Sequence, residues 1–178
     1  YFEESGDNEN LLDFVMSQFR SGGAIDNRSW AAFFQGTYDL TDKWHLTAGL
    51  RYTDEEKKFR PDQVILLNKF AGSGHPLLDA PFMQKTQTIE EVTPMINLSY
   101  DWAEDLMVYG SYSEGFKSGG FTQRVFPPIV AGFTAPPGTP AIDLIPEFQP
   151  EFGKVYELGL KYATPGPRLR VNGAAVAT

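Results

Sequence analysis

The 178-residue sequence contains no cysteine, so it has no disulfide framework, no thiolate metal site and no cysteine nucleophile. It also lacks an excess of basic residues, since 15 Lys and Arg stand against 23 Asp and Glu, a net charge of −8. Nucleic-acid-binding proteins normally present a basic face, so this balance argues against nucleic acid as a partner. No apolar run approaches the ~18 residues of a transmembrane helix. Residues 1–14 show neither the basic nor the apolar region of a signal peptide.

Aromatic residues, glycine and proline are plentiful, with 14 % aromatics, 17 Gly and 13 Pro. This composition favours an all-β chain with many turns. Between residues 29 and 53, apolar and polar side chains alternate in two runs joined by the short segment Leu40–Trp44. A period of two predicts strands, and a short polar joint between two strands predicts an antiparallel hairpin.

The rest of the chain repeats this unit. We predict an extracellular loop over residues 1–27 and, from about 28 to 178, six strands arranged as three hairpins within one partial barrel domain. The joints near residues 41–43, 101–105 and 164–167 are short, whereas the connections over 60–85 and 117–150 are long and rich in Gly and Pro. Short and long connections therefore alternate, which puts the short turns at one end of a meander and the long loops at the other.

Transmembrane β-barrels have this asymmetry, with short periplasmic turns and longer extracellular loops. The predicted strands are about ten residues or longer, whereas typical strands have ~5–6, and aromatic residues flank each short turn. We therefore predict an all-β, antiparallel up-and-down meander that forms part of a transmembrane β-barrel. Six strands do not close a barrel, which needs about eight, so we expect an internal piece of a larger one. The alternative is a soluble all-β binding module, such as a carbohydrate-binding sandwich, whose apolar stripe would be buried.

Three segments resemble the barrel domain of TonB-dependent outer-membrane receptors. They are Leu46–Glu55 (LTAGLRYTDE), Val108–Phe121 (VYGSYSEGFKSGGF) and Tyr156–Lys161 (YELGLK), and their order and spacing also match. The resemblance implies a barrel of ~22 strands plugged by an N-terminal domain, in the Gram-negative outer membrane and in contact with its lipid. It implies active uptake of a scarce nutrient such as an iron–siderophore complex, driven by a TonB-type energy-coupling protein. Neither a plug domain nor an aromatic-terminated final strand is recognisable in this sequence.

The sequence offers no enzyme motif. There is no G-x-S-x-G elbow and no GxxxxGK[ST] phosphate loop, and two isolated histidines without cysteine do not make a metal site. We therefore expect no catalytic, cofactor-binding or metal-binding residues. Glu55, Glu56, Glu90 and Glu91 are expected to lie near the extracellular ends of their strands and to form rim ion pairs with Lys57 and Lys58, each worth ~0–1 kcal/mol.

Basic side chains on the lumen face are the candidates for contact with an anionic small-molecule ligand. Arg51, Lys161 and Arg170 fall on that face, although any such barrel also needs a polar lining. The substrate-contact candidates are Arg51, Lys117, Arg124 and Lys161.

Overall fold

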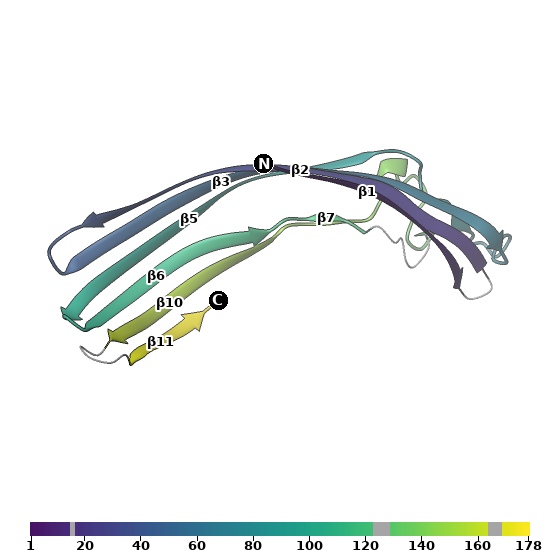
Figure 1. Cartoon of the computed structure of the whole chain (residues 1–178). Helices are drawn as coiled ribbons and strands as arrows, with labels where there is room; N and C mark the ends of the chain where they lie inside the picture. The colour runs from purple at the N-terminus through teal and green to yellow at the C-terminus, as the bar shows by residue number, and fades with distance from the viewer. Residues whose placement is uncertain (15–16, 123–128, 164–168) are drawn as a thin grey trace. The chain divides into compact units, whose positions relative to one another are not determined.

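The computed structural model describes residues 1–14, 17–122, 129–163 and 169–178. Seven long strands form one sheet in which each strand lies beside its sequence neighbour (Figure 1). The antiparallel meander is therefore confirmed. The strands, in spatial order, are β1 (Phe2–Phe14), β2 (Ser17–Asp39), β3 (Trp44–Asn68), β5 (Lys85–Ala103), β6 (Leu106–Lys117), β10 (Glu151–Ala163) and β11 (Arg170–Ala177).

From β2 to β10, short and long connections alternate as predicted, but β1 is separated from β2 by only two residues, so two short connections follow each other at the start of the sheet. Between β2 and β3, the amide N–H of Leu40 donates to the carbonyl of Trp44 at 2.8 Å, and the Thr41 hydroxyl accepts from the amides of Lys43 and Trp44. Two residues, Glu104 and Asp105, connect β5 to β6. The predicted turn between β10 and β11 falls on residues 164–168, outside the described residues.

The prediction of a loop over residues 1–27 is wrong. Residues 2–14 form β1, which pairs with β2 from Phe2↔Ser29 to Phe14↔Ser17, so that β2 begins eleven residues before the predicted strand. This segment is polar and acidic, and period-two patterning does not reveal a strand that has no apolar face to bury. Backbone pairing with β2 holds it instead. The strand β3 also continues to Asn68, through part of the predicted 60–85 connection.

The chain divides into two compact units. Unit 1 comprises Tyr1–Trp30, Asp54–Ile89 and Ser118–Pro150, and unit 2 comprises Ala31–Thr53, Glu90–Lys117 and Glu151–Thr178. Unit 1 also contains two short antiparallel pairs and a 3-10 turn. These are β4 (Leu77–Leu78) with β8 (Ile129–Val130), β7 (Gly120–Phe121) with β9 (Glu147–Phe148), and η1 (Ala141–Leu144).

Unit 1 has its own apolar core. The Phe59 side chain of β3 is fully buried and stacks on Phe121, with ring centroids 5.7 Å apart, and Ile145 completes the cluster. A second cluster joins Ala80, Ile129 and Ala135. Described residues of the 118–150 segment contribute to both clusters, and Phe121 and Ile145 pack against Phe59 of β3 by hydrophobic burial.

Two lysines attach the 118–150 segment of unit 1 by polar contacts as well. The Lys57 ammonium donates to the Ser118 hydroxyl and to the Gly119 carbonyl, both at 2.8 Å. Lys85 donates to the Ile145 carbonyl at 3.2 Å and pairs with Glu147 at 3.3 Å. Each ammonium is compact and carries three donors, so one side chain can satisfy several acceptors of the segment at once.

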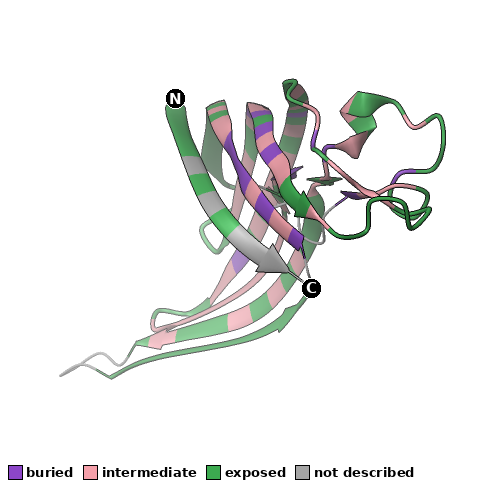
Figure 2. Ribbon diagram, turned by 90° about the vertical axis from the view of Figure 1, so that its right-hand side faces the viewer, coloured by how far each residue is buried: buried purple, intermediate pink, exposed green. Residues whose placement is uncertain are grey.

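Unit 2 contrasts with unit 1 in burial. Every buried hydrophobic residue of the described chain belongs to unit 1, and β10 and β11 show no buried residue (purple in Figure 2). Large apolar side chains of unit 2 are instead exposed, for example Phe34 at 76 % and Leu158 at 71 %. The sheet of unit 2 is therefore not folded around a core of its own among the described residues.

Replacing Phe59 with Ala is expected to loosen the 118–150 segment. Phe→Ala in a core costs about 3–5 kcal/mol because both transfer energy and packing are lost. Hydrogen exchange of the 118–150 amides in the complete protein should speed up, while the amides of β10 stay protected. Phe133→Ala is the matched control, since the Phe133 side chain is 76 % exposed. Equal exchange in the two variants would contradict the assignment of the core.

Candidate functional site

The sheet of unit 2 has two chemically different faces. In the register of β5, β6 and β10, Ile96, Tyr112 and Tyr156 form one row, and the adjacent row contains Asn97, Ser111 and Glu157. Successive side chains of a strand point to opposite faces, so the first row belongs to an apolar face and the second to a polar face. The polar face carries the hydroxyl, amide and charged groups that a hydrophilic ligand would meet.

A three-residue cluster is the most organised feature of the polar face. The Tyr109 hydroxyl of β6 donates to a carboxylate oxygen of Glu157 on β10, and the Lys161 ammonium lies 5.3 Å from the centre of the Tyr109 ring. The cluster offers an aromatic surface with a carboxylate on one side and a cation on the other. The ammonium lies over the ring in a cation–π contact, so the cluster presents a carboxylate, a phenol and a cation side by side to a polar ligand.

Gly159 makes this arrangement possible. It pairs with Tyr109 across the two strands, and a Cβ at Gly159 would lie 2.5–2.6 Å from Cζ, Cε1 and the hydroxyl of Tyr109. The tyrosine ring therefore lies directly over the glycine, between Glu157 and Lys161. Glycine is needed here for close approach of a side chain and not for an unusual backbone angle.

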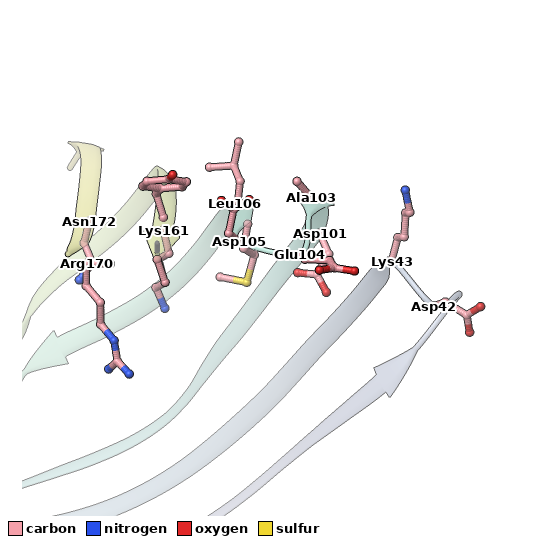
Figure 3. Close-up of a pocket in the computed structure, with 13 residues that line it drawn as sticks. Asp42, Lys43, Asp101, Ala103, Glu104, Asp105, Leu106, Lys161, Arg170 and Asn172 are labelled. Atoms are coloured by element: carbon pink, nitrogen blue, oxygen red, sulfur yellow. The ribbon is translucent and has the colours of Figure 1, made fainter. Parts of the chain in front are cut away.

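A cavity of about 890 Å³ lies at the turn end of unit 2. Its lining separates charge (Figure 3): carboxylates come from the β2–β3 turn and the β5–β6 hairpin, and the cations Lys161 and Arg170 come from β10 and β11. Lys43 is the only cation on the acidic side of this lining. The acidic members are Asp42, Asp101, Glu104 and Asp105. This lining is complementary to a ligand or protein surface that carries a positive group and a negative group at separate positions.

His45 connects three strands next to this cavity. Its Nδ1 lies 2.6 Å from Asp39 Oδ1 on β2, and its Nε2 lies 3.1 Å from Asp101 Oδ2 on β5. A carboxylate faces each ring nitrogen, and only the doubly protonated imidazolium can donate to both. The contact ties together β2, β3 and β5 at the turn end of the polar face.

Two of the four predicted contact residues lie within the polar face, but they are not adjacent. Arg51 on β3 donates to the Thr53 hydroxyl at 3.2 Å, and Lys161 lies on β10, three strands away. Three strand spacings correspond to ~14 Å across the sheet. Lys161 also lies in the row of Asp101, which is hydrogen-bonded to Lys43, and the eight residues from Lys43 to Arg51 add ~27 Å along the strands. One small ligand therefore could not contact both side chains.

Of the other two predicted contact residues, Lys117 lies at the end of β6 in a loose, exposed ion pair with Glu151 at 3.9 Å. Arg124 lies outside the described residues. Sequence reasoning missed Tyr109 and Glu157, although both occupy lumen positions of the alternating pattern.

Two of the four predicted carboxylates, Glu55 and Glu56, form the expected ion pairs. Lys57 pairs with Glu55 at 3.2 Å and Lys58 with Glu56 at 2.5 Å, both in unit 1. The Lys57–Glu55 pair is mostly buried, because the 118–150 segment contacts the same ammonium. This pair is therefore not a solvent-exposed surface ion pair, because its ammonium also binds this segment.

The described residues contain neither a membrane-spanning helix nor a cluster of metal ligands. Residues 1–14, 17–122, 129–163 and 169–178 contain no helix with the length and apolarity to cross a membrane. Within the same ranges, no three or more His, Asp or Glu side chains are grouped so that they could hold a metal ion.

A meandering sheet with an exposed apolar face and a polar face opposite is the kind that builds the walls of membrane β-barrels. The family model described as TonB dependent receptor-like, beta-barrel matches residues 2–176. The chain belongs to this family of TonB-dependent receptor barrels.

A solved structure supports the fold. The ferric yersiniabactin uptake receptor FyuA from Yersinia pestis matches with a TM-score of 0.71 at 20% sequence identity, over 98% of this chain and 23% of the receptor. This chain thus spans about a quarter of the length of that receptor. A search among curated proteins found no match.

Replacing Gly159 with Val tests the Tyr109 cluster. The valine side chain would overlap the ring, and overpacking of this kind costs about 1–3 kcal/mol. Samples are incubated at increasing temperatures and then run on a gel without boiling. We expect the band of the folded barrel to be lost at a lower incubation temperature in this variant. Gly153→Val on the same strand and face is the control, because nothing lies within 4 Å of its Cβ position.

A double variant sharpens this test. Combining Gly159→Val with Tyr109→Ala removes the overlapping ring, so the two changes should be less than additive. Strict additivity would show that the ring does not lie over Gly159.

Proposed function

We propose that this chain forms part of the barrel wall of an outer-membrane TonB-dependent receptor for active uptake of a scarce nutrient. The apolar face of unit 2 contacts outer-membrane lipid, and the polar face lines the lumen. Transport, not catalysis, is the activity. Energy comes from a TonB-type partner that acts through a plug domain, as in the family that the chain resembles in sequence.

The observation that carries this proposal is the exposure of the apolar face in unit 2. Burying apolar surface is worth roughly 25 cal/mol per Å², so a row of exposed leucines and aromatics is favoured next to lipid and disfavoured in water. The aromatic side chains support this orientation. Trp44 and Tyr52 bound the apolar run of β3 in unit 2, and eight residues at ~3.4 Å each span ~27 Å, close to the ~25 Å apolar band of such barrels.

An iron–siderophore complex is the substrate that we propose. The fold shared with a receptor for a ferric complex supports this choice, and the polar face carries the cations Arg51, Lys161 and Arg170, which complement an anionic chelate.

Ligand binding by the complete receptor tests this proposal. Lys161→Gln should weaken binding of an accepted ferric siderophore about tenfold, since a hydrogen bond to a charged group contributes about 1.5–3 kcal/mol. Lys154→Gln is the control, because Lys154 is on the same strand but on the opposite face. Titration of the receptor with a panel of ferric siderophores under iron limitation provides the readout. If no ferric complex binds, the substrate assignment is wrong. Equal losses of affinity in the two variants would show that Lys161 does not contact the ligand.

Solubility separates this function from a soluble binding module. We expect the chain to require detergent or lipid and to lack a cooperative monomeric unfolding transition in plain buffer. A chain that stays soluble and unfolds cooperatively without detergent would overturn the membrane assignment.

A further inference from the structure

The two long connections of unit 1 meet in a small sheet of their own. The connection from β3 to β5 contributes β4, and the connection from β6 to β10 contributes β8. Leu77 pairs with Val130 and Leu78 with Ile129 in antiparallel register, and this two-stranded sheet is separate from the seven-stranded one. Two segments that are distant in the sequence therefore share backbone pairing.

Contacts beside this pair extend it past the two strands. Both backbone groups of Ala131 are used, since its amide donates to the Pro76 carbonyl at 2.9 Å and its carbonyl accepts from His75 Nδ1 at 3.2 Å. A carbonyl can only accept, so Nδ1 carries the proton in this contact. The His75 and Phe133 rings also meet edge to face, with centroids 5.2 Å apart. His75 thus joins the two connections through its ring nitrogen and through its ring.

The turn after β8 is closed by its own hydrogen bonds. The Thr134 hydroxyl accepts from the Val130 amide at 2.6 Å and donates to the Val130 carbonyl at 3.1 Å. Gly132 has a φ of +82°, which glycine adopts without steric cost, and a Cβ there would lie 3.1 Å from His75 Nδ1. Because the turn is held together locally, a displacement of His75 is transmitted to the turn as a whole.

An apolar cluster needs both connections. Ala80, Ile129 and Ala135 are 7%, 5% and 8% exposed, and Leu78 packs against them. Ala80 and Leu78 come from the connection between β3 and β5, and the other two come from the connection between β6 and β10. A lone two-stranded sheet is marginal in water, so burial of this cluster supplies the missing stability. Separation of the connections would expose both sides of the cluster to water.

We infer that residues 75–80 and 129–135, here called the cross-loop unit, open and close as a single cooperative body, so that neither long connection moves without the other. Folded proteins open locally in contiguous cooperative units, and the strand pair, the His75 contacts and the apolar cluster all depend on the same two segments. The consequence for uptake rests on the proposed function: a substrate that displaces one connection must displace the other.

Hydrogen exchange of the complete receptor tests the inference. Thr134→Ala removes the side-chain hydrogen bonds that close the turn, and these lie within residues 129–135. We expect amide exchange to become about tenfold faster both in residues 129–135 and in residues 77–80, because the cross-loop unit opens as a whole. Thr139→Ala is the matched control, since its hydroxyl donates to the Pro136 carbonyl at 2.7 Å, outside the unit. Faster exchange in residues 129–135 alone would overturn the inference.

His75→Ala perturbs the cross-loop unit from the other connection, so the test does not depend on the folding of one variant. It removes the donor to the Ala131 carbonyl and the contact with the Phe133 ring. Exchange should become faster in residues 129–135 by the same factor as in residues 77–80. An effect confined to residues 77–80 would contradict a single cooperative body.

A cross-link tests whether the two connections have to separate during uptake. Leu77→Cys with Val130→Cys places two cysteines opposite each other, where Cβ atoms lie ~4.5–5.5 Å apart, close to the distance in a disulfide. This sequence has no other cysteine. Uptake of a ferric siderophore by cells that carry the complete receptor should be the same before and after oxidation, because the two segments move together.

Loss of uptake on oxidation that a reductant restores would overturn the inference, since it would show that the segments must part. If the unaltered receptor takes up no ferric siderophore, the proposed function is refuted instead. The hydrogen-exchange result then still decides whether the cross-loop unit is cooperative.

Discussion

Backbone pairing between neighbouring strands is the constraint on which the rest of this structure depends. In a membrane, every backbone N–H and C=O must be satisfied within the protein, because lipid offers no partner. Once the strands satisfy each other in register, the side chains are divided strictly between two faces. A one-residue slip would exchange those faces, so the short turns that fix the register also fix which residues lie on the apolar face and which lie on the polar face.

Two glycines of unit 2 illustrate what this division permits. Gly159 lies on the polar face, where the Tyr109 ring occupies the position of a Cβ. Gly110 lies on the apolar face, where a Cβ would lie 3.1 Å from Leu158 Cδ2. The residue across the strand pair decides which side chain each glycine accommodates, a tyrosine in one case and a leucine in the other.

Unit 1 is stabilised in a different way. Its strands carry charged residues at the positions that are apolar in unit 2, so the alternation gives no hydrophobic stripe. Stability comes instead from local burial of Phe59, Phe121 and Ile145 and from lysines that hold the carbonyls of the 118–150 segment. This construction allows long connecting segments to be ordered without a continuous core, as expected for loops that carry function on a rigid scaffold.

The sequence by itself determined the hairpins from residue 29 onward, the alternation of short and long connections and the family, because a period of two along a half-apolar strand is a local signal. It also placed Arg51 and Lys161 on the polar face. Only the tertiary structure revealed that residues 2–14 form a strand, since pairing with β2 leaves no trace in a polar segment. It alone showed that Tyr109 lies over Gly159 beside Glu157 and that Lys57 binds Ser118 and Gly119. These features depend on which residues of neighbouring strands lie opposite each other, and register is a property of the assembled sheet, not of any one strand.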